Sequence, residues 1–544
     1  MFRTARPDLG PASPRHHADA AAGRIFSIAG VTSIAGLAVL GLLFQYRGAL
    51  GEPDLYRVVA SLLEGHASGQ GARSPMQYGR SFSFGYYELL YGLLDEAVLT
   101  SPDRLMAVIN TIGFVSAIAA LALLFVAVRT WHGPRVAFVT AALFGLSPMV
   151  LDLTTSGHPV LPSLAAYGLG VALMSRPSTG VLRLVLWALA SLAFLVGLTI
   201  RAEILIALGW PVVAGADTAS LARFLRSAAL RALPAVLAVA AFFVAQAGYV
   251  ESGSGGGAGT LLAFMRTFYS LGQIGKGMAF LAIGFGSATL ILAASAAVVV
   301  LRRSPQRSID RARLAIALLL EPAALILPCL VLWLPNPNPA RHFLFALLGT
   351  ALFIGLVLER TKPRPASSVL LVLAAIVGNQ LIGEFSRPAV ISALKSPYTN
   401  FPDRPRTLTQ APLGALWVHH ASLVQRRAAL DTEAARLPTF CDRQVIVLTI
   451  DPMQMVLALY RDGHPPRLSE TKLGPFDAIS AVRPNGQTFF LVPRYPYWPR
   501  DVVAEIIAMP ALASFAIWDV PLSRSIYDRT PVPRNRMPRD DCPA

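Results

Sequence analysis

Two carboxylates, a tyrosine and an arginine follow directly on a long apolar run. The run covers residues 26–46, and the segment after it carries Glu52, Asp54, Tyr56 and Arg57. Asp54 has a simple structural explanation, because aspartate is a good N-cap and the next residues have the apolar spacing of a helical face. The alternative is a functional carboxylate, which can accept a proton during a reaction. The neighbourhood of Asp54 decides between the two.

Ionisable side chains also stand at the ends of later apolar segments, on the side where the first run ends. They are Asp152, His158, Arg201, Glu203, Lys276, Arg341 and His342. Charges at membrane depth are costly and tend to mark a functional site. Taken singly, each has a simpler interpretation as a paired or snorkelling residue. Their convergence at one face therefore favours a site, provided that the topology holds.

The composition is that of a multi-pass membrane protein. Of the 544 residues, 54% are hydrophobic and 14% charged, and long apolar segments recur between short polar loops. The net charge of +16 raises the possibility of a nucleic-acid partner. The arginines cluster in alternate loops, however, which is the positive-inside pattern. The basic balance therefore reports topology, and we predict no nucleic-acid partner.

We predict about eleven transmembrane helices. Their approximate ranges are 26–46, 104–128, 136–151, 159–174, 184–200, 202–215, 232–250, 277–300, 314–334, 342–358 and 368–385. The break at residues 199–203 is either a tight external turn or a charged pair inside one long helix. With residues 1–25 as an irregular cytoplasmic tail, every arginine cluster falls on one side and the C-terminus lies outside.

Two large external regions follow from this topology. The first loop, residues 47–103, contains two amphipathic segments, which we predict to be helices on the membrane surface. Three tyrosines of the second segment, Tyr86, Tyr87 and Tyr91, suit the headgroup layer. The other region is residues 386–544, where the composition becomes that of a globular domain.

The C-terminal region is long enough for one small α/β domain. Residues 443–451 and 488–495 are predicted strands, and residues 502–515 a predicted helix. Cys441 and Cys542 either form a disulfide in an exported domain or remain two free thiols. The fold class is thus an all-α polytopic membrane protein with a small extracytoplasmic α/β domain.

The chain resembles the GT-C type of integral-membrane glycosyltransferases, which take a sugar from a polyprenyl phosphate carrier. Protein mannosyltransferases, aminoarabinose transferases of lipid A and oligosaccharyltransferases belong to this type. The resemblance covers residues 26–385. It is carried by the acidic residue before YRVVASLLEG, the long first loop, TTSGHP (154–159), GLTIRAE (197–203) and PARHF (339–343).

The resemblance implies roles for individual residues. Asp54 occupies the place of the family's catalytic acidic residue, and Glu52 shares or takes that role as an alternative. Asp152 lies near the place of a second acid, whereas His158 stands where some relatives carry one. We therefore predict no metal site and leave a divalent cation open. The implied substrate-binding residues are Arg341, Arg201, Lys276, His342, His158, Tyr56 and Arg57.

The implied function is an inverting transfer from a polyprenyl-phosphate-linked sugar to an acceptor hydroxyl on the extracytoplasmic side. A carboxylate would serve as general base, and cations would stabilise the leaving lipid phosphate. The acceptor would be a glycolipid, a polysaccharide or a protein, and the location the bacterial inner membrane. The alternative is a transporter or flippase for a lipid-linked or anionic substrate. That class commonly has inverted repeats, and the sequence shows no internal repeat.

Overall fold

The structure is a computed structural model, and part of the chain is described from it. The described residues are 14–44, 58–59, 62–63, 65–66, 69, 84–214, 216, 220–250, 274–303, 308–334, 340–394, 444–447, 467–468, 489–494 and 516–521.

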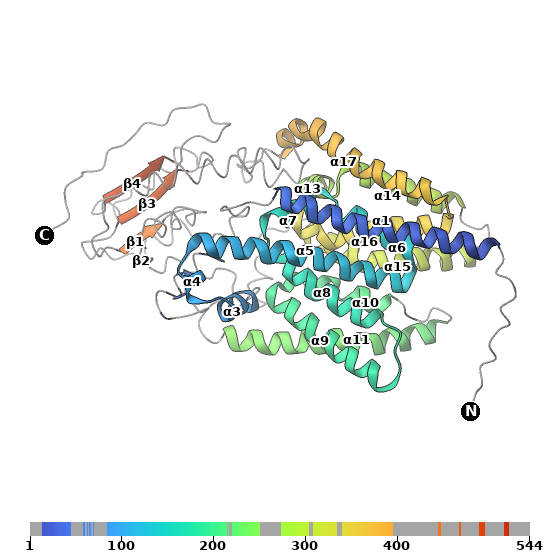
Figure 1. The fold of residues 1–544 in the computed structure, drawn as a ribbon, viewed down its shortest axis with the longest axis horizontal. Helices are drawn as coiled ribbons and strands as arrows, with labels where there is room; N and C mark the ends of the chain where they lie inside the picture. The colour runs from blue at the N-terminus through green and yellow to red at the C-terminus, as the bar shows by residue number, and fades with distance from the viewer. Residues whose placement is uncertain are drawn as a thin grey trace.

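Helices that lie side by side form the body of the molecule (Figure 1). Their bounds are α1 Pro14–Phe44, α3 Phe84–Leu93, α4 Glu96–Leu99, α5 Pro102–His132, α6 Pro134–Gly145, α7 Pro148–Ser156, α8 Val160–Ser175, α9 Gly180–Ile200, η3 Ala202–Ala207, α10 Gly209–Val213, α11 Leu221–Val250, α13 Ile274–Phe285, α14 Ser287–Arg303, α15 Ser308–Trp333, η5 Ala340–Phe343, α16 Leu344–Thr361 and α17 Pro365–Leu394. Helix α1 begins at Pro14, so part of the predicted irregular tail is helical.

The chain is a multi-pass membrane protein. Among the described helices α1, α5, α9, α11 and α16 are long and apolar enough to cross a bilayer. Helices α6 and α7, bent by 65°, together add a sixth. Shorter apolar helices coincide with the remaining predicted spans: Val160–Ser175, Ala202–Val213, Ser287–Val300, Leu318–Trp333 and Pro365–Leu381. Every predicted span thus falls on an apolar helix, and the total of eleven crossings stays a prediction.

The helices divide into an inner set and a lipid-facing set. Helix α16 is buried along almost its whole length and packs against α6 and α15. By contrast, α9 exposes a row of large aliphatic side chains, including Val181, Leu184 and Leu192. Exposed apolar surface of this extent suits a helix that faces lipid tails.

A glycine contact closes the corner between α7 and α8. Gly157 has φ +68°, and a Cβ built on it would lie 2.6 Å from Asn110 Oδ1 on α5. A Cβ on Gly113 of α5 would in turn collide with the backbone of Gly157. Only glycine permits both the left-handed backbone and this close approach. The contact fixes α7, which carries Asp152, and the turn that carries His158.

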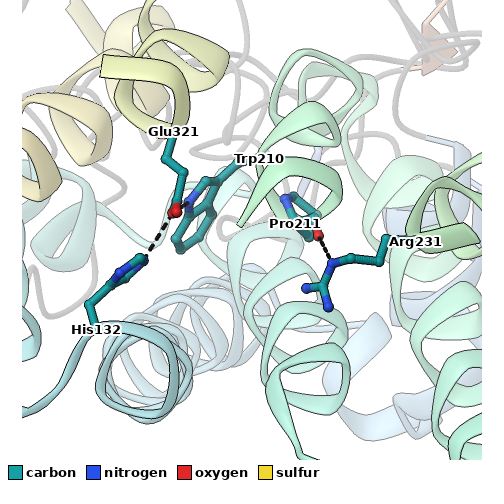
Figure 2. Close-up of polar contacts among 5 residues, drawn as sticks. All are labelled: His132, Trp210, Pro211, Arg231 and Glu321. Carbon is teal, nitrogen blue, oxygen red and sulfur yellow. Dashed lines mark hydrogen bonds and ion pairs between the residues drawn. The ribbon is translucent and has the colours of Figure 1, made fainter. Parts of the chain in front are cut away.

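A half-buried glutamate ties several helices together at another point (Figure 2). Glu321 Oε2 on α15 lies 2.9 Å from His132 Nε2 of α5 and accepts a hydrogen bond of 3.2 Å from Trp210 Nε1 of α10. Beside this group, Arg231 Nε of α11 donates to the Pro211 carbonyl at 3.2 Å. Charge-assisted hydrogen bonds of this kind are shorter and stronger than neutral ones.

The first loop packs into the protein, contrary to the predicted membrane-surface aromatics. Val59 and Leu62 are fully buried, as are Tyr86 and most of Tyr87 on α3. Burial, with a smaller contribution from the neighbouring Tyr87, raises the pKa of Tyr86. The headgroup-layer interpretation of Tyr86 and Tyr87 is therefore wrong, because protein and not lipid covers these rings.

The C-terminal region contributes a four-stranded parallel sheet in the order β2-β1-β3-β4. The strands are β1 Gln444–Val447, β2 Arg467–Leu468, β3 Phe489–Arg494 and β4 Ala516–Pro521. Strands β1 and β3 confirm the two predicted strands. The predicted helix 502–515, Cys441 and Cys542 lie outside the described residues. Helix α17 continues to Leu394, past the predicted domain boundary at residue 386.

We expect Glu321→Gln to lower the apparent unfolding temperature of the protein in detergent. The change removes the charge that His132 and Trp210 share, and bonds to a charged group are worth about 1.5–3 kcal/mol. The control is Glu359→Gln, because Glu359 is 44% exposed and lies 3.7 Å from Arg135 Nε. Equal effects of the two variants would contradict a structural role for the Glu321 cluster.

We expect Gly157→Ala to destabilise the protein more than Gly180→Ala does. Both glycines have positive φ, but nothing lies within 4 Å of a Cβ built on Gly180. Backbone strain alone costs about 1–2 kcal/mol, and the collision with Asn110 adds about 1–3 kcal/mol. Thermal unfolding of the two variants measures the difference, and a Gly157→Ala protein as stable as Gly180→Ala would refute the close contact.

Candidate active site

The break between α9 and η3 is a turn, which settles the two interpretations of residues 199–203. Helix α9 ends at Ile200, and Arg201 has an extended backbone with φ −153°. Beyond it, the 3-10 helix η3 packs against α15 and α8. Arg201 and Glu203 therefore stand at a corner of the chain and not inside one continuous helix.

This corner joins three of the ionisable residues singled out from the sequence. Arg201 Nη2 donates to Glu203 Oε1 at 2.5 Å, and His342 Nδ1 of η5 lies 3.2 Å from the same oxygen. The side chains are 18%, 17% and 10% exposed, respectively. Glu203 thus bridges two 3-10 turns that are far apart in the sequence.

The face of the His342 ring makes a second contact. The ring of Trp333, the last residue of α15, stacks on His342 with centroids 4.4 Å apart and planes 28° from parallel. The next residue, Phe343, is fully buried. Sequence reasoning placed Glu203 in the charged set without giving it a role, and it did not single out Trp333. The position of Trp333 at the end of an apolar span, beside the loop to PARHF, was the available signal.

Two cations among the predicted substrate-binding residues lie on elements that meet at the same place. Arg341 belongs to η5, and Lys276 to the first turn of α13. The two elements pack against each other, and Gly277 approaches Leu334 so closely that a Cβ there would collide with the Leu334 carbonyl. The structure describes the backbone of Arg341 and Lys276 but not their side chains.

Asp152 and His158 are both fully buried. The His158 Nδ1 accepts a 3.1 Å hydrogen bond from the Val160 backbone N–H, so the neutral ring carries its proton on Nε2. Asp152 lies on α7, which packs against α13 and η5. The fold therefore brings these two residues to the neighbourhood of the Glu203 bridge, but without exposing them.

The first acidic pair lies outside the described residues, as do Tyr56 and Arg57. The last turn of α1, which precedes these residues in the sequence, is described. A Cβ built on Gly41 of α1 would lie 3.1 Å from the Thr154 methyl of α7. The end of α1 thus lies beside the helix that carries Asp152. Within the described part of the chain, no three His, Cys, Asp or Glu side chains gather in a way that could hold a metal ion.

No family model and no curated relative match this chain. Among solved structures, it is similar to ArnT from Cupriavidus metallidurans in the apo state, with a TM-score of 0.51 and 15% identity over 80% of this chain and 85% of that one. The structure of ArnT bound to undecaprenyl phosphate gives a TM-score of 0.50 and 14% identity over 83% and 88% of the two chains.

An oligosaccharyltransferase from Archaeoglobus fulgidus, tethered with an acceptor peptide, gives a TM-score of 0.45 and 12% identity. The alignment covers 84% of this chain and 65% of the oligosaccharyltransferase chain. Of these structures, the two of ArnT reach a TM-score of 0.50. Their similarity covers four-fifths or more of this chain and agrees with the fold that the resemblance implies: the chain has the fold of ArnT.

Proposed function

We propose that the chain is an inverting glycosyltransferase that moves a sugar from a polyprenyl phosphate carrier to an acceptor hydroxyl. The observation that carries the proposal is the fold shared with ArnT, which has been solved with undecaprenyl phosphate bound. A shared fold alone does not fix an activity. The charged corner of Arg201, Glu203 and His342, beside the elements that hold Arg341 and Lys276, supplies the local chemistry.

The arrangement of the helix ends supports a site on the extracytoplasmic side of a bacterial inner membrane. In Figure 1, α3, α4 and the strands lie toward one end of the helical body, and the start of α1 lies toward the other. At the opposite helix ends, Arg176 follows α8, Arg302 lies in the last turn of α14, and Arg364 precedes α17. By the positive-inside rule, those ends are cytoplasmic. The site and the C-terminal region are then outside.

In the proposed reaction, an acceptor hydroxyl attacks the anomeric carbon of the donor. Asp54, or Glu52 in its place, accepts the hydroxyl proton as the new C–O bond forms. The bond from the anomeric carbon to the phosphate oxygen breaks with its electron pair, and the lipid phosphate leaves with a second negative charge. A single displacement of this kind inverts the anomeric centre.

The described contacts support a proposed order among the candidate groups for this reaction. Arg201 uses Nη2 to bind Glu203, so its charge is already partly neutralised. Arg341 and Lys276 are therefore the first candidates for stabilising the leaving phosphate. Asp152 is fully buried, and it serves better as a support for the site than as the base that meets the acceptor.

We expect Asp54→Asn to abolish transfer of one sugar in cells that keep normal amounts of the protein. Loss of a general base costs about 10²–10⁴-fold in rate. Mass spectrometry of cell-surface glycans and lipid-linked sugars in wild-type, deletion and Asp54→Asn strains measures this, and the missing sugar identifies the product. The control is Asp103→Asn, an exposed carboxylate at the start of α5.

Two outcomes would contradict parts of this prediction. If the deletion loses a sugar but Asp54→Asn retains it, the base is not Asp54, and Glu52→Gln and Asp152→Asn are the variants to compare. If the deletion leaves every glycan unchanged, the transferase proposal is wrong and transport of a lipid-linked substrate becomes the function to assay.

We expect Arg341→Ala to weaken the binding of undecaprenyl phosphate to the purified protein in nanodiscs. A charge-assisted contact worth about 1.5–3 kcal/mol corresponds to roughly a 10–100-fold loss in affinity. The control is Arg364→Ala, because Arg364 is an exposed cation between α16 and α17. Equal affinities of Arg341→Ala and the wild type would exclude Arg341 as a phosphate ligand.

A further inference from the structure

The Glu203 carboxylate contacts two basic side chains, those of Arg201 and His342. Its Oε1 accepts from Arg201 Nη2 at 2.5 Å and lies 3.2 Å from His342 Nδ1. All three side chains are less than one-fifth exposed. At this level of burial, an ion pair is screened much less than at the surface. Removal of the shared carboxylate would take the acceptor from the Arg201 guanidinium and the neighbouring charge from His342.

The carboxylate also connects elements that the chain keeps apart. Arg201 directly follows α9 and Glu203 belongs to η3, whereas His342 belongs to η5, which precedes α16. A 3-10 turn as short as η5 has poor hydrogen-bond geometry of its own. Its position therefore depends on side-chain contacts, and His342 makes two that are defined, to Glu203 and to Trp333.

We propose that Glu203 is a positioning residue, which holds η5, and with it Arg341, through His342. This inference rests on the proposed function, because Arg341 is there assigned to the leaving phosphate. Arg341 directly precedes His342 in η5, so any shift of the turn moves both. Misplacement of a positioning group by about 1 Å can cost on the order of 10²-fold in a reaction.

The chain offers a matched control for this inference. His132 and Glu321 form another histidine–glutamate pair, 2.9 Å apart and 14% exposed on each side chain. At about 1.5 Å per residue, Glu321 lies about 18 Å from Trp333 along α15. Glu321→Gln likewise removes a partly buried carboxylate beside a histidine, but far from η5.

The first measurement is hydrogen–deuterium exchange of the peptide that covers η5 and the start of α16. We expect faster exchange there in Glu203→Gln than in the wild type, and unchanged exchange in Glu321→Gln. This readout does not depend on any substrate. Unchanged exchange in Glu203→Gln would overturn the proposal.

The second measurement is the affinity of the same variants for undecaprenyl phosphate in nanodiscs. We expect about a tenfold loss for Glu203→Gln and for His342→Asn, and no further loss in the double variant, because the two residues act as one unit. Glu321→Gln should bind as the wild type does, even if it unfolds at a lower temperature. Additive losses, or an affinity of Glu203→Gln equal to that of the wild type, would overturn the proposal.

The two measurements separate this inference from the proposed function. If the wild-type protein does not bind undecaprenyl phosphate, the proposed donor is wrong. Faster exchange of η5 in Glu203→Gln alone would still support the positioning of the turn by Glu203. If the wild type binds undecaprenyl phosphate and Arg341→Ala does not, a Glu203→Gln variant with wild-type affinity and exchange refutes only the positioning role of Glu203.

Discussion

A carboxylate inside an apolar helix bundle is stable only where donors surround it, and this constraint organises two distant parts of the protein. Glu321 collects a histidine from α5 and an indole N–H from α10. Glu203 collects an arginine from the end of α9 and a histidine from η5. Each glutamate thus connects segments that lie far apart in the sequence. One of these places lies within the bundle, and the other forms the charged corner.

Close packing stabilises the contacts between helices in lipid, where the hydrophobic effect gives no driving force for helix association. Gly157 and Gly113 let α5 meet the corner after α7 backbone to backbone. At the break between α13 and α14, a side chain binds the free backbone groups. Asn379 of α17 accepts from the Thr289 N–H at 3.1 Å and donates to the Phe285 carbonyl at 3.4 Å. Polar groups freed by a broken helix are satisfied by a neighbour, as an apolar environment requires.

Hydropathy and charge were enough to predict the apolar helices, since both are properties of short windows of sequence. They also located the strands β1 and β3, but they left residues 199–203 open between a turn and a charged pair inside one long helix. They could not predict that Tyr86 is buried, because an amphipathic aromatic segment suits lipid and protein equally well. Nor could they pair Glu203 with His342, since spacing along the chain says nothing about contacts between separate turns. The charged corner was thus predictable as a set of residues, but not as a bridge.

The charge balance at the corner bears on how the proposed reaction would be accelerated. Arg201 and Glu203 largely cancel each other, so they add little net attraction for a donor that carries one negative charge. The leaving phosphate acquires a second charge only as the bond breaks. Cations that meet this charge from a fixed position stabilise the transition state more than the bound donor. The η5 turn is held by the contacts of His342 with Glu203 and Trp333. A cation on a turn that is already ordered stabilises the phosphate better than one on a turn that becomes ordered only when the donor binds, because ordering the turn would consume part of the binding energy.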